Sequence, residues 1–481
     1  MTTMTWHSAV VEPELRAKRR VSWSFKAVMS FIALGYACQL MLLLPDFGAS
    51  RTIIRSASFL GSLVMVALVP RKSNQQHPAL LPVMGCLLVI ALGLLHPNTD
   101  SIKGGIAVWI WYVCLMIPIL WAGGSEIDAR EFRWILLAVW AFNSASAAVG
   151  VLQVQYPGQF QGSLSSVVEA SDFGGENLKF TLADGTVTFR PMGLSDQPGG
   201  AGLASLIAIT LSVALLLNEK SWWFKLACYG STACSIFCVY LSQFRVIMVM
   251  IVVSLAAFST AMFVRGEFAR ITRILLSLSI VAAGATFWAF AQGGEMIVDR
   301  VMTLFSDSAG TVYYQNRGFF LESTFYMIPK YFFGAGLAKW GMMSYYFGSE
   351  GANADLWAEI GWTGWLFDGG VPLMACMGTA ILAALWVAWR MATTRNNGVI
   401  GLWAAVIFAY GVGAFAMSFS GHFFNSTMGM EFWMLNGLLF AVSANARTNN
   451  SAQPRRPLPV AAAAALQTPS QSAAGRGAVN P

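Results

Sequence analysis

Charged and aromatic side chains concentrate in one stretch of an otherwise apolar chain, between Arg317 and Gly370. Two carboxylates in it, Asp355 and Glu359, are four residues apart and share one face if residues 353–361 are helical. Carboxylates can take a proton from a hydroxyl group, and an arginine such as Arg317 can bind anionic groups. In a membrane protein, a long polar and aromatic insert between spans is a place for sugar or head-group chemistry. We therefore interpret this stretch as the active-site loop.

The composition around that loop indicates a membrane protein. Of 481 residues, 56% are hydrophobic and 11% are charged, and the mean hydropathy is +0.58. A soluble domain has about 25% charged residues. Apolar runs long enough to cross a bilayer recur along the chain, so we predict an all-α polytopic integral membrane protein rather than a barrel of short alternating strands. The seven cysteines lie in apolar runs, which argues against a disulfide framework or a zinc site. The net charge of +7 comes from Lys and Arg scattered at the ends of these runs, so nucleic acid is not an expected partner.

About twelve membrane spans are predicted, each roughly one bilayer long. They fall at 27–44, 53–69, 79–95, 105–122, 132–152, 199–217, 223–241, 246–264, 272–291, 369–389, 399–417 and 425–443. They divide the chain into a cytoplasmic segment (1–26), five spans (27–152), a long loop (153–198), four spans (199–291), the large catalytic loop (292–368), three spans (369–443) and a disordered cytoplasmic tail (444–481).

The orientation follows from the positive charges in the short connections. These hold Arg71, Lys72, Arg130, Arg133, Lys220, Lys225, Arg265, Arg270, Arg273, Arg390 and Arg395. Positive loops stay inside, so both termini are predicted to be cytoplasmic and both long loops to lie outside. In the first long loop, alternating residues on both sides of Asp184-Gly185 predict a small β-hairpin. The second is expected to form short helices at the outer face, where Phe, Trp and Tyr suit the interface.

Four segments resemble motifs of the bacterial O-antigen ligase and polymerase superfamily of membrane glycosyltransferases. They are RPMGLSDQPGGAGLASL (190–206), LSQFR (241–245), Arg317 through FFGAG (332–336) and ANADLWAEIGWTG (352–364). The order of these motifs and the two long outer loops are also similar to the family, over residues 30–443.

The resemblance implies a donor, undecaprenyl pyrophosphate carrying an oligosaccharide repeat unit, and no metal or other cofactor. It implies a multi-pass protein of the bacterial inner membrane with its active site on the periplasmic face. A flippase and a chain-length co-polymerase are the expected protein partners. In the ligases the fourth motif begins with a His, and here that place holds Ala352. This favours a polymerase of an exopolysaccharide or O-antigen over a ligase that transfers glycan to lipid A-core or protein.

Such a donor leaves as an anion, so the protein must stabilise negative charge. Arginine suits this task because its planar fork binds phosphate oxygens in pairs. We predict that Arg245 and Arg317 clamp the pyrophosphate, with Arg190 as a third candidate. The alternative is that each side chain reaches to lipid head groups.

The acceptor hydroxyl needs a general base or strong positioning, and Asp355, Glu359 and His422 are the candidates. His422 lies in the short outer segment GHFFN and could replace the missing motif His in space. The alternatives are ordinary solvation or capping for the carboxylates and a structural role for the His. The predicted substrate-binding residues are Asn353, Lys330, Lys339, Trp357 and Glu431. Glu431 lies inside the last span and is expected to pair with an Arg or to line a cavity.

Other classes of function stay open. Metal-dependent sugar transfer often uses an Asp-x-Asp triplet, which the sequence does not contain. A polysaccharide flippase is the main alternative outside the enzymes. Transporters often show two related halves, and the two long outer loops here are too unequal for that pattern.

Overall fold

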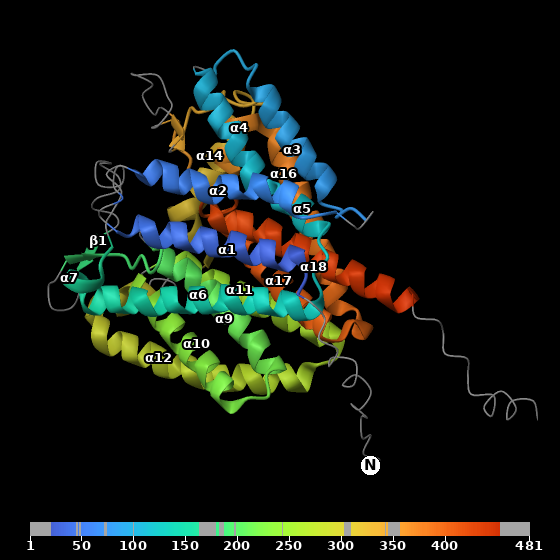
Figure 1. Ribbon diagram of the computed structural model, residues 1–481. Helices are drawn as coiled ribbons and strands as arrows, with labels where there is room; N and C mark the ends of the chain where they lie inside the picture. The colour runs from blue at the N-terminus through green and yellow to red at the C-terminus, as the bar shows by residue number, and fades with distance from the viewer. Residues whose placement is uncertain are drawn as a thin grey trace, which may run out of the picture.

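The computed structural model describes residues 21–44, 47, 50–71, 75–99, 101–162, 179–181, 187–196, 199–242, 244–302, 309–341, 343–344 and 356–452. Its longer helices, at least 14 residues each, are α1 (Trp23–Leu42), α2 (Arg51–Leu68), α3 (Leu80–Gly93), α4 (Ile102–Met116), α6 (Ala129–Gln155), α9 (Gly200–Asn218), α10 (Trp222–Ser242), α11 (Arg245–Arg265), α12 (Phe268–Met302), α16 (Gly361–Thr393), α17 (Gly398–Met417) and α18 (Thr427–Ala452). The shorter elements are α5 (Pro118–Gly123), α7 (Pro157–Phe160), β1 (Lys179–Thr181), β2 (Val187–Phe189), α13 (Ala309–Tyr313), η3 (Tyr314–Gly318), α14 (Phe319–Met327), η4 (Arg395–Asn397) and η5 (Phe423–Asn425). In Figure 1, the axes of α1, α2, α6 and α12 lie roughly horizontal, and α3, α4 and α16 form the upper part.

The architecture is that of an all-α polytopic membrane protein. Each of the twelve predicted spans overlaps a helix of the structure. Among the described residues, ten helices are long and apolar enough to cross a membrane, counting α4 and α5 together. Two of the twelve do not meet that measure: α3 has only 14 residues, and α18 is absent from the ten. Of the twelve predicted spans, ten correspond to helices that are both long and apolar enough to cross a membrane; α3 is too short, whereas α18 has 26 residues and so does not fall short in length.

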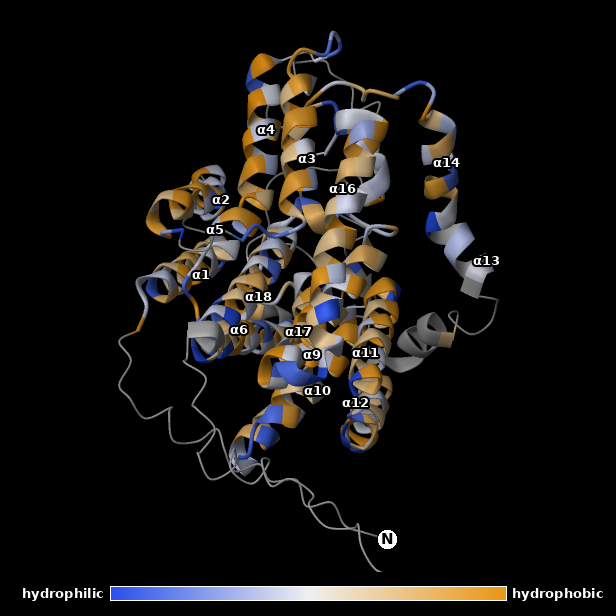
Figure 2. Cartoon of the chain, turned by 90° about the vertical axis from the view of Figure 1, so that its right-hand side faces the viewer, coloured by the Kyte–Doolittle hydropathy of each residue, from blue (hydrophilic) through white to orange (hydrophobic). Residues whose placement is uncertain are grey.

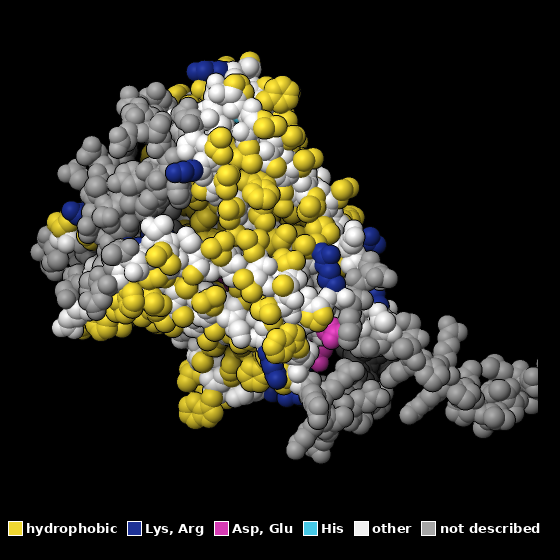
Figure 3. All heavy atoms as spheres, turned by 45° about the horizontal axis from the view of Figure 1, so that its top comes forward, with side chains coloured by type: hydrophobic (Ala, Val, Ile, Leu, Met, Phe, Trp, Pro, Cys, Tyr) yellow, Lys and Arg dark blue, Asp and Glu magenta, His cyan; other side chains and the backbone are white. Residues whose placement is uncertain are grey.

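The outer surface of the bundle is apolar, as a lipid-facing surface must be. Large side chains such as Leu81, Ile280 and Phe287 are more than three-quarters exposed. Hydrophobic residues cover the outward sides of α3, α4 and α12 in Figure 2, and a broad area of hydrophobic side chains fills the face in Figure 3. The centre is occupied by α9, whose residues from Ala204 to Leu217 are all buried.

Connections alternate between two ends of the bundle. The short-loop end carries the connections 69–79, 124–128, 219–221, 266–267 and 394–397, and the long-loop end carries 156–199 and 303–360. At the short-loop end, Asp128 and Glu131 form a capping box that starts α6. Glu131 also accepts hydrogen bonds from the backbone and hydroxyl of Ser22, at 2.7 and 2.9 Å. Because Ser22 itself caps α1, these contacts join the starts of α1 and α6.

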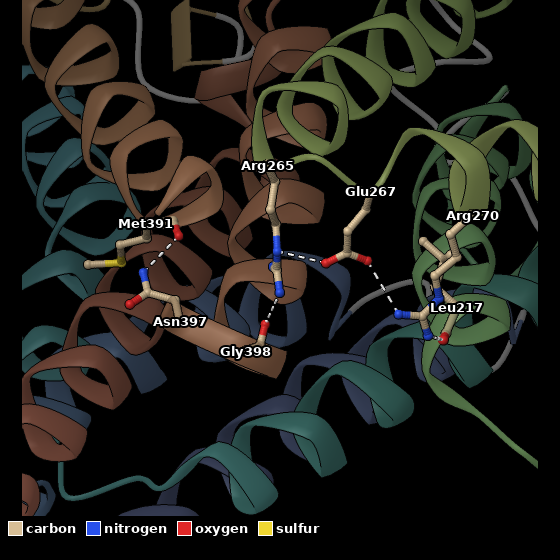
Figure 4. Close-up of polar contacts among 7 residues, drawn as sticks. All are labelled: Leu217, Arg265, Glu267, Arg270, Met391, Asn397 and Gly398. Atoms are coloured by element: carbon tan, nitrogen blue, oxygen red, sulfur yellow. Dashed lines mark hydrogen bonds and ion pairs between the residues drawn. The ribbon is translucent and has the colours of Figure 1, made fainter. Parts of the chain in front are cut away.

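The basic residues that are predicted to lie inside also connect other helices at the short-loop end. Glu267 accepts from both Arg265 and Arg270 in the turn between α11 and α12 (Figure 4). Arg265 also donates to the carbonyl of Gly398 at the start of α17, at 2.5 Å, and Arg270 donates to the Leu217 carbonyl in the last turn of α9. The arginines of this end therefore have structural contacts in addition to their effect on topology.

The two long connections contain short elements. Strands β1 and β2 pair antiparallel with Phe180 opposite Thr188, on either side of Asp184-Gly185, where the sequence predicts a hairpin. The predicted loop 292–368 is shorter than expected, because α12 extends to Met302 and α16 begins at Gly361. Between them, α13, η3 and α14 stand beside the bundle (Figure 2).

Candidate active site at the long-loop end

Arg317 lies in a turn of unusual helical geometry. It belongs to η3, a π-helical turn between α13 and α14. Such turns insert one residue into a helix and occur often at functional sites. The Arg317 Nη1 atom donates to the Oε2 atom of Glu359, and the Arg317 side chain is 37% exposed. The ion pair therefore lies at the surface of the fold, where part of the guanidinium stays accessible.

Glu359 uses both of its oxygens. Oε2 accepts from Arg317, and Oε1 accepts from the indole Nε1 of Trp357 at 2.9 Å. Residues 356–359 are not helical, and Ile360 has the extended angles φ −120° and ψ 153° before α16 begins. Asp355 and Glu359 would share a face only if residues 353–361 were helical, and residues 356–359 do not meet that condition, because α16 starts at Gly361. Ala352, Asn353 and Asp355 themselves lie outside the described residues.

His422, which comes later in the sequence, contacts the same segment. Its Nε2 atom lies 2.8 Å from the carbonyl oxygen of Ala358, the residue before Glu359. A carbonyl only accepts, so Nε2 carries the proton in this contact and Nδ1 is the lone-pair atom of the neutral ring. Nδ1 is buried and has no hydrogen-bond partner among the described residues. Burial lowers the pKa of His422, and the Ala358 contact opposes part of that effect.

Backbone contacts fix His422 against α16. The Gly361 N–H lies within hydrogen-bond distance of two carbonyl oxygens, at 2.9 Å from Ser418 and 3.0 Å from Gly421. The turn that carries His422 is thus docked on the first residue of α16. The ring of Trp340 covers the imidazole, with centroids 4.9 Å apart. These contacts bring Arg317, Glu359 and His422 together from three separate segments of the chain.

A chain of buried hydrogen bonds lies below this cluster, and sequence reasoning missed it. Asp368 accepts from Trp340 Nε1 at 2.8 Å and from the Tyr112 hydroxyl at 2.7 Å. Asn425 continues the chain, with 3.5 Å to that hydroxyl and 3.4 Å to Trp365 Nε1. The available signal was a carboxylate in the apolar run that begins α16, since such residues are costly in a membrane without partners.

A break in α16 positions Asp368. Gly370 has φ +67°, a conformation that favours glycine, and a Cβ there would overlap the Phe332 carbonyl. Val371 N–H donates to that carbonyl at 2.9 Å, and Ala335 N–H donates to the Phe367 carbonyl at 2.7 Å. The FFGAG segment of the sequence is therefore inserted at the break.

The other two predicted arginines form a separate group. Arg245 begins α11, and the guanidinium of Arg190 lies 4.3 Å from the ring centroid of Phe244, the preceding residue. Gly199 packs against the ring of Phe244. It has φ +82°, and it lies so close to Phe244 that a Cβ would collide with the ring. Arg190 therefore lies next to the start of α11, where Arg245 is the first residue.

The remaining predicted binding residues lie in different surroundings. Lys330 is exposed, with its Nζ atom 5.0 Å from the Tyr331 ring centroid. Lys339 is half-buried, in the turn just before Trp340. Glu431 lines a cavity between helices, which is the second of the two environments expected for it, and none of its described contacts is with an arginine.

Helices and site together define a polytopic membrane protein with a polar cluster at its long-loop end. No model of a known protein family matches the chain, and no curated protein matches it in sequence.

Proposed function

We propose that this chain is a polysaccharide polymerase. It transfers a growing glycan from undecaprenyl pyrophosphate onto a lipid-linked oligosaccharide repeat unit, in the synthesis of an exopolysaccharide or O-antigen. The observation that carries the proposal is the convergence of Arg317, Glu359 and His422. The partly exposed guanidinium of Arg317 and the neutral imidazole of His422 both contact one segment, residues 358–359.

The reaction needs one displacement. The acceptor hydroxyl oxygen attacks the anomeric carbon of the donor sugar, and the bond from that carbon to the pyrophosphate oxygen breaks. The electron pair of that bond leaves with the pyrophosphate, and the hydroxyl proton goes to a base. No metal is required in this scheme, because a guanidinium supplies the positive charge that the leaving group needs.

Arg317 is the proposed partner of the pyrophosphate. A guanidinium has five N–H donors, and one of them is used by Glu359. The others can bind phosphate oxygens in pairs. Glu359, held also by Trp357, is better suited to fixing the orientation of Arg317 than to accepting a proton. Arg190 and Arg245 are proposed to bind the anionic donor at a second point.

His422 is the proposed base. Its Nδ1 atom has a free lone pair, and the lowered pKa keeps the ring neutral near pH 7. Removal of a proton from the hydroxyl is the step that a positioned imidazole can accelerate. Ala352 stands where the ligases carry a His, which supports a polymerase over transfer to lipid A-core or protein.

The proposal includes a place in the cell: the bacterial inner membrane, with the short-loop end and both termini in the cytoplasm. The basic residues of the short connections support this orientation. Single cysteines placed in 160–185 should react with an impermeant thiol reagent added outside intact cells, and cysteines in 265–271 should not. The reverse pattern would put the site on the cytoplasmic side.

Chain elongation by purified protein tests the function directly. The protein in lipid nanodiscs is given lipid-linked repeat units, and longer lipid-linked glycans are the expected product. A flippase would instead move the repeat unit across the membrane of a proteoliposome without lengthening it. Transport without elongation would overturn the proposal in favour of that second class.

A further inference from the structure

A cavity of about 200 Å³ lies between α1, α2, α6, α9 and α18, towards the long-loop end. Its walls include the polar residues Gln39, Arg55, Asn143, Asp196, Asn425 and Glu431. The remaining lining is largely aromatic and apolar, with Tyr36, Phe142 and Trp111 among the rings. A mostly apolar pocket with a few convergent polar groups is the usual form of a small-molecule site.

Glu431 is the group that the fold leaves unsatisfied in this cavity. Its Oε1 atom is buried and has no hydrogen-bond partner among the described residues. An unpaired carboxylate inside the membrane is costly, so its retention points to a ligand that donates hydrogen bonds. Asn143 adds acceptor capacity, because its Nδ2 donates to the Val139 carbonyl at 2.9 Å and its Oδ1 remains for a ligand.

The charges on the other wall are already balanced. Arg55 donates to Asp196 through both Nε and Nη2, and the side chains are 18% and 8% exposed. This pair therefore offers polar surface without a net charge. An anionic group would face Glu431, and a hydrocarbon chain would leave Glu431 without a partner. Both ligand types are disfavoured.

Gly35 shows that the space is open rather than filled by protein. It lies on the face of α1 that lines the cavity, and a Cβ built on it meets no atom within 4 Å. A cavity needs about 10–15 Å³ of such space to hold one water, so this cavity has room for a small organic molecule such as one six-membered sugar ring.

We propose that this cavity binds one sugar ring, with its hydroxyl groups donating to Glu431 and Asn143 and its apolar face against the aromatic side chains. The choice of a sugar rests on the proposed function. The cavity also reaches the candidate site, because Asn425 belongs both to its lining and to the buried chain through Tyr112 to Asp368. The bound ring is therefore part of the glycan that takes part in the transfer.

Saturation-transfer NMR on the full chain in nanodiscs tests this site. The probes are glucose, galactose, N-acetylglucosamine and glucuronic acid, each added alone. At least one neutral sugar should receive magnetisation from the wild-type protein. Gly35→Leu, which fills the cavity, should abolish that signal. Gly230→Leu is the matched control: Gly230 is exposed on α10, and a Cβ there also meets nothing within 4 Å.

Glu431→Gln tests the acceptor itself. Replacing an acceptor oxygen by an NH₂ donor should weaken sugar binding about tenfold or more. Equal signals from wild type and Gly35→Leu, or no signal from any of the sugars, would overturn the proposal. Glucuronic acid binding more tightly than the neutral sugars would also contradict it, since Glu431 repels a second carboxylate.

Elongation assays on the same variants separate this inference from the function on which it rests. Sugar binding that depends on Gly35, in a protein that does not elongate glycans, would overturn the polymerase alone. Elongation that survives Gly35→Leu unchanged would overturn the cavity site alone.

Discussion

Arg317 donates to Glu359 across 42 residues of chain, and this contact joins a π-helical turn to the extended segment before α16. The pair holds the guanidinium from one side. Its remaining donors are what a pyrophosphate would meet.

Arg317→Ala is expected to lower the elongation rate by about 10²–10³, the usual effect of removing one donor to a developing anion. Arg317→Lys should restore only part of it, because an ammonium lacks the planar fork. Lys330→Ala is the matched control, a cation of the same loop that is exposed and near only the Tyr331 ring among its described contacts. Equal losses in both variants would mean general attraction to anionic lipid instead of local recognition.

Arg245→Ala tests the second arginine group in the same assay, and we expect a loss of similar size. Arg190→Ala should have a smaller effect if Arg190 acts mainly through its contact with Phe244. Arg190→Lys keeps a charge over the ring and should stay near wild type. An inactive Arg190→Ala beside a fully active Arg245→Ala would reverse the roles assigned to the two residues.

Glu359→Gln should slow elongation only through Arg317. The double variant with Arg317→Ala should then be no slower than Arg317→Ala alone, because the second change removes a contact that is already lost. Rate constants for the four proteins give this comparison. Additive losses would indicate that Glu359 contacts the substrate itself.

His422 should give the elongation rate an unusual pH profile. Burial lowers its pKa, so the base stays neutral as the pH falls through 6.5, where an ordinary His is half protonated. We expect the midpoint of the decline in rate to lie below pH 6.5. His422→Gln should lose about 10²–10⁴ in rate, the typical contribution of a general base. A midpoint above pH 7 would argue against His422 as that base.

Gly370→Ala should destabilise the protein by unseating the FFGAG segment. A residue other than glycine in this region of φ and ψ costs about 1–3 kcal/mol, and the new Cβ would also overlap the Phe332 carbonyl. Gly378→Ala lies on the same helix, where a Cβ meets its nearest neighbour, Trp362, at an ordinary 3.6 Å. Thermal unfolding in detergent should therefore show a lower Tm for the first variant and an unchanged Tm for the second.

The spans were predictable from sequence because long apolar runs and their flanking charges are local properties. The convergence of Arg317, Glu359 and His422 into one site was not predictable in this way. His422 and Ala358 are 64 residues apart, and only the docking of Gly361 on the turn after α17 brings them together. Arg317 could be named as a candidate from its place in the polar loop. Its ion pair with Glu359 depends on a helix that begins at Gly361, and boundaries of this kind are not encoded by periodicity. Asp368 went unassigned because its partners, Tyr112 and Trp340, come from distant segments.

The arginine contacts between helices at the short-loop end limit how the molecule can move. Arg265 bridges α11 to α17, Arg270 bridges α12 to α9, and Arg133 pairs with Glu219 between α6 and α9. A carrier that works by alternating access has to part its helices at both faces in turn. Here, parting α11 from α17 at this face would break the hydrogen bond from Arg265, whose side chain is 9% exposed, to the Gly398 carbonyl. These contacts hold the helices together at the short-loop face, and under the proposed function the glycan would enter and leave at the long-loop face.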